Sequence, residues 1–152
     1  MPAKSRPKHV LDAWALLALL QKEEPAATRV KSVIDTAQRG QCEVFASLIN
    51  IGEVYYSVGR SKGVSEANAV LEDIEQLPLG IIPADRSAVI QAATLKATHR
   101  LSYADAFAMA TAHALDATLM TGDPELILLK THVRIEPLTR QGSSRASGRS
   151  LT

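Results

Sequence analysis

Four acidic residues lie where carboxylates could carry out chemistry together. Asp12 and Asp123 each follow a short apolar run, whereas Glu53 and Asp105 lie inside segments with helical spacing. Carboxylates that converge in a partly dry cleft repel one another, and a divalent cation relieves that repulsion. Mg²⁺ or Mn²⁺ accepts such oxygen ligands and leaves coordination positions open for the oxygens of a phosphate. If these four side chains converge, they could support metal-assisted hydrolysis of a phosphate ester.

Three of the acids also have a purely structural explanation. Asp12 and Asp123 each precede a helical segment, so each can act as its N-cap. Asp105 follows Ser102 by three residues, as in a capping box, although an aspartate side chain is shorter than the usual Glu or Gln. The segment around Asp105 is very apolar, and a buried carboxylate needs a charge partner or several hydrogen-bond donors.

Glu53 has no capping role in the sequence. On a helix it shares one stripe with Asn50, Ser57 and Arg60, at steps of three or four residues. A solvated helix face is the commoner explanation for a single Glu in such a stripe. Taken one at a time, the four acids are therefore better explained by structure, and only their convergence argues for function.

The elements that must position these acids alternate along the chain. The expected strands cover residues 8–12, 42–47, 79–84, 117–121 and 133–138, and the expected helices cover residues 13–24, 25–40, 48–60, 65–77, 86–99, 101–115 and 123–129. We expect Ser65 to start the fourth helix. This alternation predicts an α/β fold, with a small parallel sheet flanked by helices on both faces. The carboxyl ends of parallel strands share one edge, which is where sites in such folds gather.

Composition limits the class of protein. The chain has 152 residues, 46% hydrophobic and 22% charged, and a formal net charge of +1, which does not indicate a nucleic-acid binder. A single cysteine, Cys42, no apolar run of membrane-spanning length and no signal-peptide pattern lead us to expect a cytoplasmic protein without a membrane contact. We expect one domain over residues 1–138, followed by a disordered tail over residues 139–152, where arginine, serine and glycine recur.

Four segments resemble, in this order, the motif blocks of the PIN-domain family, and most closely those of its VapC-type toxins. They are "HVLDAWALLALL", "SLINIGEVYYSVGR", "LSYADAFAMATA" and "ATLMTGDPEL", and the resemblance runs from about His9 to Leu138. It implies a PIN-like fold and an acidic quartet that binds Mg²⁺ or Mn²⁺ for RNA hydrolysis. The residues that match the quartet are Asp12, Glu53, Asp105 and Asp123.

Two polar residues also match the family, and one residue departs from it. Thr121 matches a hydroxyl residue beside the last acid and Asn50 a frequent polar neighbour, so the resemblance implies that both orient substrate or water. Family members often carry Ser or Thr two residues after the first acid, where this chain has Trp14.

The resemblance implies a metal-dependent endoribonuclease that is the toxin of a toxin–antitoxin pair. Its implied partners are an RNA substrate, a cognate antitoxin protein and a second copy of the chain. The alternative is a PIN-fold protein that binds RNA or a partner without catalysis, but such a protein would usually have lost an acid. A phospho-receiver domain is disfavoured because "VLDAW" lacks paired acids and "VRIEPL" lacks a lysine. The histidines, including His99 and His113, show no paired ligand spacing, so we expect no zinc site.

Overall fold

The computed structural model describes residues 5–141. The strands are β1 (Lys8–Leu11), β2 (Glu43–Ser47), β3 (Gly80–Ile82), β4 (Thr118–Thr121) and β5 (Ile135–Pro137). The helices are α1 (Ala13–Leu20), α2 (Ala26–Gln38), α3 (Leu48–Lys62), α4 (Val64–Glu75), α5 (Arg86–Thr98), α6 (Tyr103–Leu115) and α7 (Pro124–Ile127). Every element overlaps the segment predicted for it.

The strands form one parallel sheet in the order β3-β2-β1-β4-β5. The chain builds outward from the central strand β1 through β2 to β3, and then crosses back to add β4 on the other side of β1. Val10 of β1 is paired with Phe45 on one side and with Leu119 on the other. The direction of building therefore reverses between β1 and β4, and ligands of open α/β folds bind at the carboxyl ends of strands at such a point.

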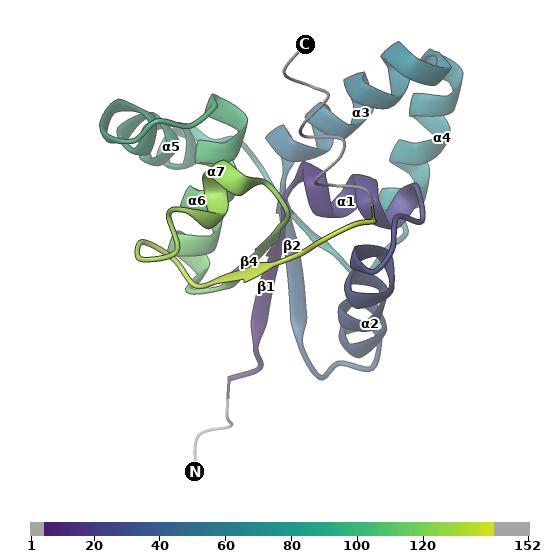
Figure 1. Cartoon of the computed structure of the whole chain (residues 1–152), viewed down its shortest axis with the longest axis horizontal. Helices are drawn as coiled ribbons and strands as arrows, with labels where there is room; N and C mark the ends of the chain where they lie inside the picture. The colour runs from purple at the N-terminus through teal and green to yellow at the C-terminus, as the bar shows by residue number, and fades with distance from the viewer. Residues whose placement is uncertain (1–4, 142–152) are drawn as a thin grey trace.

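Helices cover both faces of the sheet, which confirms the predicted fold class. Helices α1 to α4 lie on one side and α5 to α7 on the other (Figure 1). Each face of the sheet has its own hydrophobic core, because side chains alternate along each strand. Leu11 and Met120 pack in the core on the side of α1 to α4, whereas Val10 and Leu119 pack in the core on the side of α5 to α7. Within residues 5–141, no helix has the length and apolar character needed to cross a bilayer.

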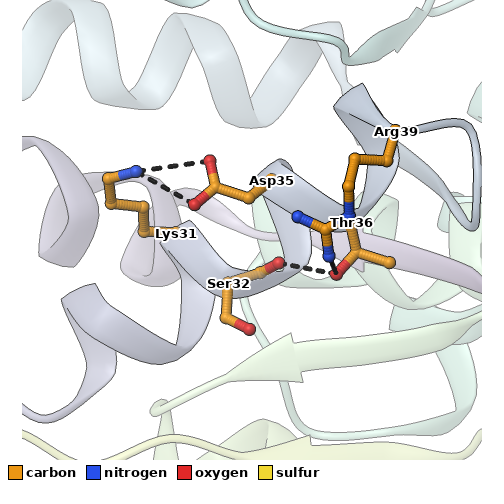
Figure 2. Close-up of polar contacts among 5 residues, drawn as sticks. All are labelled: Lys31, Ser32, Asp35, Thr36 and Arg39. Atoms are coloured by element: carbon orange, nitrogen blue, oxygen red, sulfur yellow. Dashed lines mark hydrogen bonds and ion pairs between the residues drawn. The ribbon is translucent and has the colours of Figure 1, made fainter.

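Helix α2 shows why its segment is helical and amphipathic. Its inner face buries Val30, Val33 and Ile34 in the core. On its outer face the Nζ atom of Lys31 lies 3.0 Å from an Oδ atom of Asp35, and the Thr36 hydroxyl donates to the Ser32 carbonyl at 2.9 Å (Figure 2). Such exposed pairs stabilise a helix by only about 0.3–0.5 kcal/mol each, so burial of the inner face dominates.

The start of α4 differs from the prediction. Ser65 lies inside the helix, and its N-cap is Gly63, which also ends α3. Gly63 has φ +96°, a conformation that L-residues with side chains rarely adopt, so this single glycine makes the sharp bend between the two helices. The predicted start at Ser65 was wrong because a backbone turn, and not a side-chain cap, begins the helix.

The first residues of the predicted tail hydrogen-bond to the connection between α1 and α2. The carbonyl of Thr139 accepts from the Ala26 N–H at 3.0 Å, and the Gln141 N–H donates to the Glu24 carbonyl at 2.8 Å. The described chain therefore continues four residues past β5, and the predicted disorder was wrong for residues 139–141, because they bond to the α1–α2 connection. The remainder of the predicted disordered tail, residues 142–152, lies outside the described residues.

Candidate metal centre

Asp12 and Asp123 are linked through Thr121 at the carboxyl ends of the two central strands. Asp12 is only 2% exposed and caps α1, its Oδ1 accepting from the Ala15 N–H at 2.9 Å. Its Oδ2 accepts from the Thr121 hydroxyl. The Thr121 oxygen in turn accepts from the Asp123 N–H at 3.0 Å. Both acids therefore have a capping role as well as a place in the site, since Asp123 also caps α7.

Asp105 enters the site from the first turn of α6. The Ser102 hydroxyl oxygen accepts from the Asp105 N–H at 3.1 Å, so Ser102 caps the helix as predicted. The Asp105 carboxylate lies against Asp123 and the Ser102 hydroxyl. One carboxylate oxygen each from Asp105, Asp123 and Glu125 all lie within 4.8 Å of one another. The cap and the converging acid are therefore compatible.

Asn50 holds Glu53 and joins two helices. The Asn50 side chain is fully buried, and its Nδ2 donates to the Glu53 carboxylate at 3.3 Å and to the Ala104 carbonyl at 3.1 Å. This second bond ties α3 to the start of α6. The Asn50 Oδ1 is also buried and has no hydrogen-bond partner among the described residues.

Burial and mutual repulsion raise the pKa of three of these acids. Burial, opposed by the bond from Thr121 and increased by the charges of Asp123 and Glu53, raises the pKa of Asp12 to about 7. Burial, then contact with Asp123 and the charge of Asp12, raises the pKa of Asp105 to about 8. Burial and the charge of Asp123 also raise the pKa of Glu53. The charges of all four predicted acids therefore act on one another.

The match to a known protein family covers most of the chain. The PIN domain model matches residues 9–131, which contain all four acids. This chain belongs to the PIN domain family. No curated protein matches it.

Solved structures show the same fold in distant relatives. A chain of VapBC2 from Rickettsia felis, solved bound to a DNA fragment from its promoter, superposes on this PIN domain with a TM-score of 0.67 at 17% identity, covering 87% of this chain and 99% of that one. DNA-bound VapBC from Salmonella typhimurium gives a TM-score of 0.66 at 18% identity, covering 86% and 98%. VapC20 from Mycobacterium tuberculosis, described as a Sarcin-Ricin loop cleaving toxin, gives 0.64 at 15%, covering 80% and 94%.

The donor set of this PIN domain suits a hard divalent cation. The converging groups are carboxylate oxygens, with a threonine hydroxyl and an amide oxygen beside them, and no thiol or imidazole is in the group. Among residues 5–141, none of the four predicted acids forms a salt bridge with Lys or Arg. The negative charge at this edge of the sheet therefore lacks a cationic side-chain partner, and Mg²⁺ or Mn²⁺ would compensate it.

The structure also adds one acid that we did not predict. Glu125 lies two residues after Asp123, in the first turn of α7, and its carboxylate joins the group of three. In the sequence Glu125 is simply an acid in the first turn of a helix, where the helix dipole favours it anyway. Asp12 and Glu53 lie outside that group of three. The charge of Asp123 nevertheless raises the pKa of both, and the charge of Glu53 also raises the pKa of Asp12.

We expect the metal-free PIN domain to lose stability as the pH rises from 5 to 8. Folding raises the pKa of Asp12 to about 7 and of Asp105 to about 8, so the folded state binds more protons than the unfolded state in this range. The free energy of unfolding then falls as these groups ionise. Thermal unfolding in chelator should show the fall, and saturating Mn²⁺ should raise Tm by about 3–8 °C at pH 8 and by much less at pH 5. An equal effect of Mn²⁺ at both pH values would contradict the assignment.

Substitution of the α6 cap should cost stability without removing the acid. Ser102→Ala leaves the Asp105 N–H without its acceptor, at about 1 kcal/mol, or roughly 2–4 °C in Tm. Ser102→Asp retains a capping oxygen and is the control for the cap, but it adds a further negative charge beside Asp105. At pH 5 the Asp105 carboxyl is protonated, because its pKa is raised to about 8, so it does not repel the new aspartate. Calorimetry at this pH should therefore show Ser102→Asp closer to the unsubstituted chain than Ser102→Ala.

Proposed function

We propose that this PIN domain is a metal-dependent endoribonuclease and the toxin of a toxin–antitoxin pair. The observation that carries the proposal is that the buried Asp12 and Asp105 lie close to the half-buried Asp123 at the carboxyl ends of β1 and β4. None of these acids has a Lys or Arg salt-bridge partner among residues 5–141. Family membership supports a nuclease, and the fold is similar to that of VapC20, which is itself described as a cleaving toxin.

Asp12, Glu53, Asp105 and Asp123 would hold one or two divalent ions, with Glu125 beside Asp123. A bound Mg²⁺ or Mn²⁺ ion supplies a water of lowered pKa and stabilises negative charge on a phosphate undergoing in-line attack. The protein's own contribution is positional. The acids follow β1 and β4 or lie on α3 and α6, and we infer that these four elements bring them together at the edge of the sheet where the strand order reverses.

Thr121 and Asn50 would act on the acids and on water. The Thr121 hydroxyl donates to one carboxylate oxygen of Asp12. The other oxygen accepts from the Ala15 N–H at the start of α1, so the two bonds together fix the orientation of the carboxylate. Asn50 fixes the position of the Glu53 carboxylate through its Nδ2. Both residues would therefore orient water or substrate and set the positions of the metal ligands.

The partners follow from the toxin assignment. The structurally similar proteins include VapBC complexes of toxin and antitoxin, some solved with DNA. We propose a cognate antitoxin that covers the acidic pocket with a basic side chain, an RNA substrate, and association of the chain as a homodimer. We also propose that residues 1–138 form the nuclease domain and that the protein acts in the cytoplasm.

Cleavage of a total-RNA pool by the purified chain tests the proposal. We expect cuts at defined positions with Mg²⁺ or Mn²⁺, no cuts with chelator, and an RNA target that sequencing of the new ends identifies. RNA recognition depends on loops and shape, so one or a few sites should dominate. A folded chain that binds RNA but cuts nothing in either metal would favour the non-catalytic alternative.

A further inference from the structure

Two histidines that are distant in the sequence meet on the surface of the protein. His99 ends α5, and His132 lies in the connection between α7 and β5, a segment that runs along the α5–α6 side of the sheet (Figure 1). Their Nε2 atoms are 3.2 Å apart, and the rings meet edge to face, with centroids 4.4 Å apart. His99 is half-buried and His132 is exposed, so an ion from solvent can reach both nitrogens. Their separation of 33 positions along the chain explains why the sequence showed no paired ligand spacing.

Hydrogen bonds to the His99 ring determine its tautomer. The Nδ1 atom lies 3.1 Å from the Leu95 carbonyl oxygen and 2.9 Å from the Thr98 hydroxyl oxygen. A carbonyl can only accept, and the Thr98 hydroxyl already donates to the Thr94 carbonyl at 3.1 Å. These contacts favour the tautomer with the hydrogen on Nδ1, which leaves the Nε2 of His99 unprotonated beside the Nε2 of His132. Histidines that bind metals commonly donate their other ring N–H to a backbone carbonyl in this way.

We propose that His99 and His132 form a two-histidine site for a transition-metal cation such as Zn²⁺. In tetrahedral coordination with Zn–N bonds of about 2.0–2.1 Å, two imidazole nitrogens lie about 3.3 Å apart, close to the 3.2 Å separation of the two Nε2 atoms. Two rings that both aim Nε2 at one ion would have centroids about 5.2 Å apart. The centroids here are 4.4 Å apart and the rings meet edge to face, so the exposed His132 ring must turn before both nitrogens point at one ion. Neutral imidazole suits Zn²⁺, Ni²⁺ and Cu²⁺, whereas Mg²⁺ favours oxygen ligands. Waters complete the coordination.

Metal binding requires the exposed His132 ring to turn and both rings to present an unprotonated Nε2. Without metal, the two Nε2 atoms lie 3.2 Å apart, at hydrogen-bond distance. With metal, each neutral ring carries its hydrogen on Nδ1 and coordinates through Nε2. Each ring remains neutral with one hydrogen, so binding to the neutral pair releases no net proton.

The site would bridge the two connections that flank the acidic centre. His99 lies in the turn that leads into α6, which carries Asp105, and His132 follows α7, which begins after Asp123. An ion held by both rings would tie these connections together and stabilise the fold. The proposal does not depend on RNA cleavage, and its test uses a chain in which the acidic centre is disabled.

Calorimetric titration of Zn²⁺ into the untagged Asp105→Asn chain tests the proposal. We expect one Zn²⁺ per chain with a rise in Tm, and loss of that binding in both His99→Gln and His132→Gln. His113→Gln is the matched control, because His113 lines the same surface hollow as His132 but is outside the pair, and binding should persist. His132→Cys should retain binding, since a thiolate also ligates zinc.

The result that overturns the proposal is equally defined. If the Asp105→Asn chain binds no Zn²⁺, or if His99→Gln and His132→Gln bind it as the parent does, the pair is only a hydrogen-bonded surface contact. Circular dichroism of each variant shows whether it is folded. Because His132 is exposed, its substitution should leave the fold intact even if His99→Gln does not.

Discussion

Asp105→Asn should reduce RNA cleavage by at least about 10³-fold while making the metal-free protein more stable at pH 8. Loss of a ligand at the centre removes several kcal/mol of charge stabilisation from hydrolysis. The same substitution removes a carboxylate whose pKa the fold raises to about 8, so it relieves repulsion with Asp123 in the absence of metal. Initial rates on the identified RNA and thermal unfolding in chelator measure the two effects.

Asp85→Asn is the matched control for that change. Asp85 caps α5 by accepting from the Ala88 N–H at 2.9 Å, and asparagine caps a helix about as well as aspartate. Its activity should stay within about twofold of the unsubstituted chain. Full activity in Asp105→Asn would contradict a catalytic role for the Asp105 carboxylate.

Gly122→Ala should disturb the site through Trp14. A Cβ on Gly122 would overlap the Trp14 indole, which packs against this glycine between Thr121 and Asp123. Trp14 is half-buried, and the Arg140 guanidinium, which bonds to Glu23 at 2.9 Å, lies 5.1 Å from its ring centroid. Overpacking of this kind costs about 1–3 kcal/mol, and a shift of about 1 Å in the loop could reduce activity about 10²-fold.

Two further variants, Gly52→Ala and a double variant, test whether overlap with the Trp14 indole causes the loss in Gly122→Ala, and not the replacement of a glycine as such. A Cβ on Gly52 meets nothing within 4 Å, and this helical glycine is exposed, so alanine should be neutral or stabilising by about 0.5–1 kcal/mol. Trp14→Ser in the Gly122→Ala chain opens the occupied space and should recover part of the activity that Gly122→Ala loses. Additive losses in the double variant would show that the indole is not the cause.

Much of the fold follows from local features of the sequence. The apolar strands and the caps at Asp12, Ser102 and Asp123 were all predictable, because each depends on residues close together in the chain. Parallel strands also place their carboxyl ends at one edge, so the proximity of Asp12 and Asp123 could be inferred from the alternation of elements. The sequence showed that Trp14 stands where family members often carry Ser or Thr. It did not show that Trp14 packs on Gly122.

The remaining features depend on packing between distant elements. Glu53 reaches the site because Asn50 joins α3 to the Ala104 carbonyl at the start of α6, a contact across 54 residues. Periodicity places Asn50 and Glu53 on one stripe but cannot say whether solvent or a second helix covers it. Glu125 was not predicted because an acid in the first turn of a helix is ordinary. The His99–His132 pair was not predicted because the two residues are far apart in the sequence.

Titration of Mn²⁺ into the purified chain at pH 7.5, followed by the electron paramagnetic resonance of the free ion, tests most directly the claim that these acids form a divalent-metal centre. We predict binding of one or two Mn²⁺ per chain, lost or weakened at least about tenfold in Asp105→Asn and unchanged in Asp85→Asn. Equal binding in the two variants, or none by the unsubstituted chain, would contradict the claim.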